Sequence, residues 1–80
     1  MITVTVRYFA SLRERRGLTE ETLTTAATTP AALYAELRGQ HGFPLPLERV
    51  RAVLNDEFTR WEAPLRSGDA VAFLPPVAGG

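Results

Sequence analysis

The chain has 80 residues, nine basic and nine acidic side chains, and a hydrophobic share of 45%. This length suits one small domain over residues 1–80, and the hydrophobic share is that of a globular protein rather than a disordered one. Balanced charge gives no electrostatic footprint for nucleic acid, no apolar run is long enough to span a membrane, and the start lacks a signal-peptide pattern, so we expect a cytoplasmic protein.

Two residue types that carry much protein chemistry are missing, because the sequence contains neither cysteine nor lysine. Thiolate catalysis, a cysteine persulfide and cysteine metal sites are therefore excluded, and a single histidine does not make a zinc site. The chain has no side-chain amine to accept an isopeptide bond or form a Schiff base. If this protein handles sulfur, it must hold the sulfur on another group.

The first predicted elements are a strand and a short helix. Residues 2–9 alternate between apolar and other side chains, which predicts a strand with one face toward a core. Ser11 and Glu14 match a capping box, in which each side chain bonds the backbone at the helix start. This pattern predicts a helix over residues 12–16 that ends at Gly17, since glycine tolerates the left-handed conformation.

An edge strand and the main helix follow. The threonine-rich residues 19–25 predict a second strand. Thr29 and Pro30 are typical of a helix start, and Gly42 is typical of a helix end. The apolar stripe expected on this helix comprises Leu33, Tyr34, Leu37 and, at its end, His41.

Three more strands are predicted after a proline-stiffened loop. Residues 50–54 and 57–60 are separated by a two-residue turn, and residues 70–74 form the most apolar segment near the end of the chain. Phe58 and Trp61 flank a predicted turn after the second of these segments, and we expect both side chains to close the bottom of the core.

These elements predict an α+β fold in which one main helix covers a mixed sheet of about five strands. The first and last strands are the most apolar, so we place them side by side and parallel at the sheet centre. With the short extra helix, this arrangement is a β-grasp (ubiquitin-like) roll.

Residues 75–80 are expected to form a flexible C-terminal tail that carries the reacting group. Two prolines stop the last strand, because they have no backbone N–H for a sheet ladder. Ala78 and Gly79 are small enough to enter a narrow site, and Gly80 ends the sequence with a carboxylate that an acyl-adenylate would activate. A frayed tail without a function is the simpler alternative.

The residues before this ending are candidates for a partner surface. A terminal strand in so small a domain does not bury both faces, and an exposed apolar strip marks an interface. Core and docking roles are therefore expected to divide the partner-binding candidates Phe73, Leu74, Pro75, Pro76 and Val77.

Several segments resemble the small subunits of molybdopterin synthase, a family of ubiquitin-like sulfur carriers. The resemblance spans nearly the whole chain, and its most specific part is the ending. The matching residues are 6–10, 12–14, Gly17, Asn55, Leu65, Gly68, Asp69, Val71, 73–77, Gly79 and Gly80.

The resemblance implies a chemistry for the ending. An ATP-using adenylyltransferase similar to ubiquitin-activating enzymes would adenylate Gly80, and a sulfur donor protein would convert it to a thiocarboxylate. The tail would enter the large synthase subunit, in a heterotetramer, and deliver sulfur to cyclic pyranopterin monophosphate. Gly79 and Ala78 would give access, residues 73–77 would contact the partner, and no cofactor would be permanently bound.

Other functions remain open at this point. Many relatives have Ser where this chain has Ala78, and an alanine also occurs in carriers that feed cysteine synthesis. The acceptor could therefore belong to thiamine, tRNA thiolation or cysteine synthesis. A non-covalent ubiquitin-like binding module with an inert tail, and conjugation of Gly80 to other proteins, are the remaining alternatives.

Overall fold

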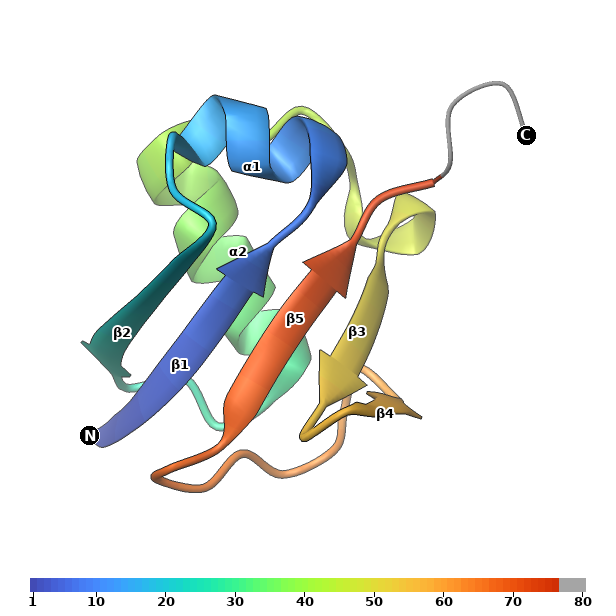
Figure 1. Cartoon of the computed structure of the whole chain (residues 1–80). Helices are drawn as coiled ribbons and strands as arrows, with labels where there is room; N and C mark the ends of the chain where they lie inside the picture. Colours follow the sequence, from blue (N-terminus) through green and yellow to red (C-terminus); the bar gives the residue numbers. More distant parts are fainter. Residues whose placement is uncertain (77–80) are drawn as a thin grey trace.

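The computed structural model describes residues 1–76, which form one layer of sheet and one layer of helix (Figure 1). In chain order the elements are β1 (Ile2–Tyr8), α1 (Ala10–Arg16), β2 (Glu20–Thr25), α2 (Pro30–His41), the 3₁₀ turn η1 (Leu47–Arg49), β3 (Arg51–Leu54), β4 (Glu57–Thr59) and β5 (Ala70–Leu74).

The five strands form a mixed sheet in the order β2-β1-β5-β3-β4. β1 and β5 are parallel neighbours, with Val6 opposite Val71 and Tyr8 opposite Phe73, and all other neighbours are antiparallel. β2 lies at an edge of the sheet, as its polar sequence predicts. The predicted β-grasp roll, with its first and last strands side by side, is confirmed.

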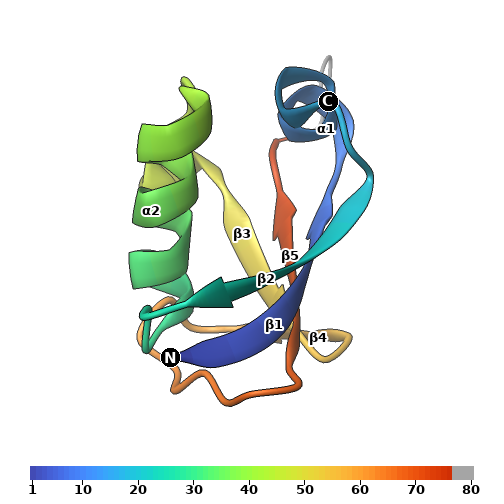
Figure 2. The ribbon, with the colours of Figure 1, turned by 90° about the vertical axis from the view of Figure 1, so that its left-hand side faces the viewer.

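Helix α2 covers one face of the sheet and leaves the other uncovered (Figure 2). Its start follows the sequence prediction, because the Thr29 side chain accepts a hydrogen bond from the backbone N–H of Ala32 at 3.1 Å and Pro30 is the first helical residue. Gly42 ends the helix with a φ of 69°.

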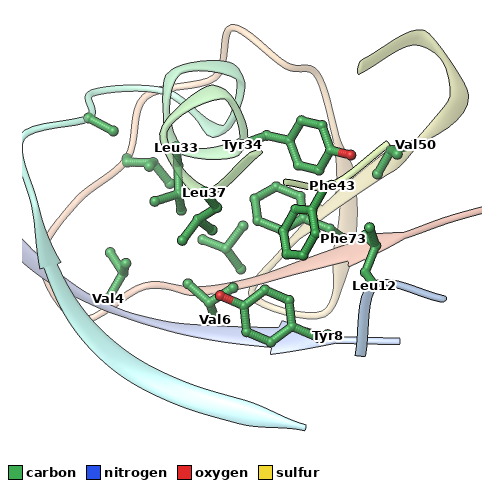
Figure 3. Packing of buried hydrophobic residues seen from close by; sticks show 13 residues of the cluster. Val4, Val6, Tyr8, Leu12, Leu33, Tyr34, Leu37, Phe43, Val50 and Phe73 are labelled. Carbon is green, nitrogen blue, oxygen red and sulfur yellow. The ribbon is translucent and has the colours of Figure 1, made fainter. Parts of the chain in front are cut away.

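The core lies between α2 and the covered face of the sheet (Figure 3). The ring of Tyr34 lies near its centre, with centroids 5.2 Å from the ring of Phe73, 5.8 Å from Trp61 and 6.1 Å from Phe43. Each fully buried large apolar side chain contributes about 1.5–3 kcal/mol to folding. The cluster of buried side chains comprises Val4, Val6, Tyr8, Leu12, Ala27, Leu33, Tyr34, Leu37, Phe43, Val50, Leu65, Val71 and Phe73.

The capping-box prediction for the short helix is wrong. Helix α1 begins at Ala10, and its N-cap is Phe9, which makes no side-chain capping bond. The Phe9 carbonyl accepts hydrogen bonds from the backbone of Leu12 and Arg13, so Ser11 falls inside the first turn. This earlier start follows directly from the end of β1, while burial of Leu12 fixes which face of the helix meets the core. The predicted end at Gly17 is confirmed.

The hairpin of β3 and β4 corrects a second expectation. Trp61 packs against the core as predicted, with its ring 6.0 Å from that of Phe73. Phe58 does not, because 69% of its surface is exposed. Side chains alternate along a strand, so the burial of Ala52 means that Val53 faces away from the core. Phe58 pairs with Val53 and therefore lies on the same outward face.

Asn55 ties the turn of this hairpin to the start of β5. Its side chain accepts a hydrogen bond from the Ala70 backbone at 2.9 Å and donates one to Asp69 at 3.0 Å, while its backbone N–H donates to the Ala70 carbonyl. Asn55 and Asp56 both have positive φ, of 51° and 71°, which asparagine and aspartate tolerate better than other side chains. The hairpin is thereby held to the central strand by three hydrogen bonds.

A partly buried ionic network holds α1 against the sheet. The Glu21 carboxylate accepts hydrogen bonds from the Tyr8 hydroxyl at 2.6 Å and from the Arg16 guanidinium at 2.9 and 3.0 Å. The Arg16 bonds, and then the Tyr8 bond, lower the pKa of Glu21. The pKa of Tyr8 is raised, mainly by burial and then by its bond to Glu21.

We predict that this network stabilises the fold at neutral pH and loses its effect at acidic pH. Because the pKa of Glu21 is lowered by folding, its ionised form stabilises the protein above the unfolded value of about 4.3, and the stabilisation is lost as the pH falls through the folded value. Glu21→Gln should lower the free energy of unfolding by about 1–2 kcal/mol at pH 7. Urea denaturation at pH 7 and pH 3 measures the difference, which should shrink at pH 3.

The matched control is Glu20→Gln, one residue earlier. Glu20 pairs with Arg7 at 2.7 Å on the uncovered face, where both side chains are about half exposed, so its loss should leave the free energy of unfolding nearly unchanged. If Glu21→Gln were equally harmless at pH 7, the network would not stabilise the fold.

Candidate functional site

The uncovered face of the sheet carries an apolar surface on β5, β3 and β4. The strand register aligns Arg7, Ala72, Val53 and Phe58 in a row across β1, β5, β3 and β4. On β1, β5 and β3 the residues next to these point into the core, as strand alternation requires. Figure 1 looks onto this face, with α2 behind the sheet.

A hollow of about 400 Å³ lies on this face. Five of its apolar lining residues form what we call the open-face patch: Phe9, Val53, Phe58, Ala72 and Leu74. Ala70, Val71 and the charged residues Arg7 and Asp56 complete the lining. Two of these are large and exposed, since 69% of Phe58 and 40% of Phe9 are accessible to solvent. Exposed aromatic side chains around a hollow are typical of a protein interface.

A second hollow begins where β5 ends. It lies between the start of α1 and the chain after Leu74, and its lining residues are Phe9, Ala10, Ser11, Glu14, Leu74, Pro75 and Pro76. Phe9 and Leu74 line both hollows. The open-face patch therefore continues without a break to the point where the C-terminal segment leaves the sheet.

The structure divides the predicted partner residues between core and surface. Phe73 is completely buried, so the expectation that its side chain contacts a partner is wrong. Phe73 pairs with the buried Tyr8, so both side chains face the core beneath α2. Leu74 faces the opposite way and is half-buried. Pro75 is half-buried and Pro76 is exposed. The remaining predicted residues, Val77, Ala78, Gly79 and Gly80, lie outside the described residues.

Of the five patch residues, sequence reasoning named only Leu74 and missed Phe9, Val53, Phe58 and Ala72. The signal for Phe9 was present, because it follows Tyr8 and therefore points away from the core. For Phe58 the sequence alone is insufficient, since its face depends on how β4 pairs with β3. Phe58 becomes a candidate only once the strand register is known, whereas alternation along the first strand could have identified Phe9.

The charges around the patch are unevenly compensated. Arg7 donates a 2.7 Å hydrogen bond to Glu20, and this bond, with the charges of Glu20 and Asp56, raises the pKa of Arg7. On the other side of the patch, the Arg51 guanidinium lies 5.3 Å from the centre of the Phe58 ring. The face thus combines an apolar floor with arginines at two borders.

The described residues that could carry acid-base chemistry are engaged in the fold. Glu20 and Glu21 point to opposite faces, with Glu20 bonded to Arg7 and Glu21 to Tyr8 and Arg16, so they do not form an acid-base pair. His41 packs its ring 5.7 Å from that of Phe43. Within residues 1–76 there is no cluster of three potential metal ligands, and no helix is long and apolar enough to cross a membrane.

The chain is similar to known proteins along nearly its whole length. It is 34% identical to the molybdopterin synthase sulfur carrier subunit of Escherichia coli over 80 residues, covering 96% of this chain and 99% of that protein. The ThiS family profile matches residues 6–80.

Two solved complexes contain similar folds. A complex of subunits 1 and 2 of the molybdopterin-converting factor from Helicobacter pylori has a chain with 30% identity and a TM-score of 0.68, covering 99% of this chain and 100% of that one. A chain of the Amycolatopsis orientalis BexX/CysO complex has 26% identity and a TM-score of 0.69, covering 96% and 99%. The ThiS family profile over residues 6–80 and the 34% identity over 96% of the chain show that this chain belongs to the ThiS family.

Proposed function

We propose that this protein is a sulfur carrier and the small subunit of a molybdopterin synthase, working in the cytoplasm. One observation carries the proposal: the open-face patch extends through Leu74 to Pro75 and Pro76, where the C-terminal segment begins. A partner protein that covers the patch therefore also contacts the chain where it leaves the sheet after Leu74. The relatives from E. coli and H. pylori support molybdopterin synthase as the context.

The proposed chemistry takes place on the carboxylate of Gly80. An adenylyltransferase joins this carboxylate to AMP from ATP and releases pyrophosphate, which turns a poor electrophile into a good one. Sulfide released by a sulfur donor protein then attacks the acyl carbon, displaces AMP and leaves a thiocarboxylate. Gly79 and Ala78 have no side chain beyond a methyl group, so they allow the segment to enter a narrow channel.

In the proposed complex, the large subunit covers the open-face patch while the thiocarboxylate sulfur attacks cyclic pyranopterin monophosphate. Water then cleaves the resulting thioester, which leaves the sulfur on the pterin and restores the Gly80 carboxylate. Two sulfur atoms are needed for a dithiolene, which fits a heterotetramer with two small subunits. The chain supplies no cofactor of its own, and ATP belongs to the activation step. Because this sequence has no cysteine, the thiocarboxylate is the form in which it carries sulfur.

A second candidate keeps the carrier chemistry and changes the acceptor. The similarity to a chain of the BexX/CysO complex, together with Ala78 before the two glycines, favours a route other than molybdopterin. The two candidates differ in which large partner binds the open-face patch, and both require an activated Gly80.

We predict that Gly80 gains one sulfur atom. The full chain is incubated with its adenylyltransferase, ATP and a sulfur donor, and intact mass is measured. The expected result is a mass increase equal to replacing one oxygen by sulfur. A chain lacking Gly80 is the control and should not change. An unmodified full chain, with an adenylyltransferase active on another carrier, would contradict the carrier function.

We further predict that the thiocarboxylated chain converts cyclic pyranopterin monophosphate to molybdopterin when the large subunit is added. Product is measured by the fluorescence of its oxidised derivative. Sulfur loading without product formation would favour the second candidate over molybdopterin synthase.

A third prediction concerns the patch itself. Phe58→Ala should weaken binding to the large synthase subunit by about tenfold or more, because Phe58 is the most exposed large side chain of the patch and an aromatic residue buried by a partner contributes over 1 kcal/mol. Isothermal titration calorimetry measures the affinity. Leu18→Ala is the matched control, since Leu18 is exposed to 40% but lies outside both hollows, and should bind normally. Equal affinity of both variants would rule out the patch as the docking surface.

A further inference from the structure

Arg51 stands at the border of the open-face patch beside the exit of the C-terminal segment. It is opposite Leu74 in the pairing of β3 with β5, and it shares a face with Val53. Its neighbour Ala52 is buried, whereas Arg51 is exposed. A group of a partner that covers Leu74 therefore lies within reach of this arginine.

The charge of Arg51 is not compensated within the part of the chain that the structure describes. Among residues 1–76, ion pairs within 4.0 Å join only Arg7 to Glu20 and Arg16 to Glu21. The side chain of Arg51 makes no hydrogen bond in this part of the chain either. Arg7, at the opposite border of the patch, is satisfied by Glu20.

Phe58 holds the Arg51 guanidinium in place without occupying its hydrogen-bond donors. The guanidinium carbon is 5.3 Å from the ring centre, within the range of a cation–π contact. Arginine that stacks on a ring keeps the N–H groups at its edge available, and their fork geometry matches a carboxylate. The contact also reduces the side-chain freedom that binding would remove.

We propose, on the basis of the proposed function, that Arg51 is a specificity-determining contact that pairs with an aspartate or glutamate carboxylate on the large subunit. The partner surface that fits has apolar side chains over the open-face patch and one acidic side chain at its border beside Leu74. Surfaces that bring a basic residue to this position are rejected, since like charges in an interface cost affinity.

A protein carboxylate fits this site better than a phosphate polymer does. Nucleic acid binding depends on many cations that neutralise successive phosphates, but this chain has no net charge, and Arg7 on the same face is paired. An arginine without an ion pair beside an apolar surface is instead typical of a protein interface, whose core is apolar and whose border is polar.

The test uses the full chain and the purified large subunit of the same organism's molybdopterin synthase. Affinity is measured by calorimetry at low and high salt for wild type, Arg51→Gln and Arg51→Glu. We expect about fivefold weaker binding for Arg51→Gln and on the order of thirtyfold for Arg51→Glu at low salt. Wild-type binding should weaken with salt, and Arg51→Gln should lose part of this dependence.

The control is Arg66→Gln, which removes an exposed arginine in the loop before β5, at the opposite end of that strand from Leu74, and it should bind like wild type. Changing each acidic residue of the large subunit's binding surface to arginine should identify one variant that restores binding to Arg51→Glu. Thermal unfolding of all variants confirms that they are folded, since Arg51 is exposed.

The outcomes separate this inference from the proposed function. If both Arg51 variants bind like Arg66→Gln while Phe58→Ala binds weakly, the patch docks the partner and the role of Arg51 is wrong. If Phe58→Ala also binds normally, the docking surface itself is wrong. If no acidic-to-arginine variant restores binding, or if sedimentation shows that Arg51 joins two copies of this chain, the assignment to a partner carboxylate is overturned.

Discussion

The parallel pairing of β1 with β5 is the constraint on which the rest of the structure depends. It joins the two ends of the described chain at the middle of the sheet and sets Val6 beside Val71 and Tyr8 beside Phe73, all of them buried. Because the side-chain period of a strand is two, this register also decides that Arg7, Ala72 and Leu74 face the other way. A slip of one residue would bury the open-face patch and expose the core.

Core and binding surface are therefore two faces of the same strands. The inner face of β5 meets Tyr34 of α2 through Phe73, with ring centroids 5.2 Å apart, and this packing fixes the strand from which the C-terminal segment departs. The outer face presents Leu74, and the chain then continues into Pro75 and Pro76, which have no backbone N–H to extend the ladder. The two prolines thus end β5 at Leu74, next to Phe9 and the start of α1.

The sequence predicts the elements and the fold well, because alternation, helix spacing and Gly or Pro punctuation are local signals. Thr29, Pro30 and Gly42 mark α2 as the structure has it. The signals fail where tertiary contacts decide. Ser11 and Glu14 have the spacing of a capping box, yet the end of β1 starts α1 earlier. The site was predicted only in part: Leu74 and the prolines lie near the surface, Phe73 is in the core, and Phe58 depends on a pairing that no local pattern reveals.

The hydrogen bonds of Asn55 have a consequence for the kinetics of association. They fasten the β3–β4 turn to Ala70 and Asp69, so the short hairpin that carries Phe58 does not have to be ordered when a partner arrives. A surface that already has its bound shape loses little conformational entropy on binding, and its encounter with a partner does not wait for a rearrangement. Association with this face is therefore expected to proceed in a single phase whose rate rises in proportion to partner concentration, as rigid docking requires.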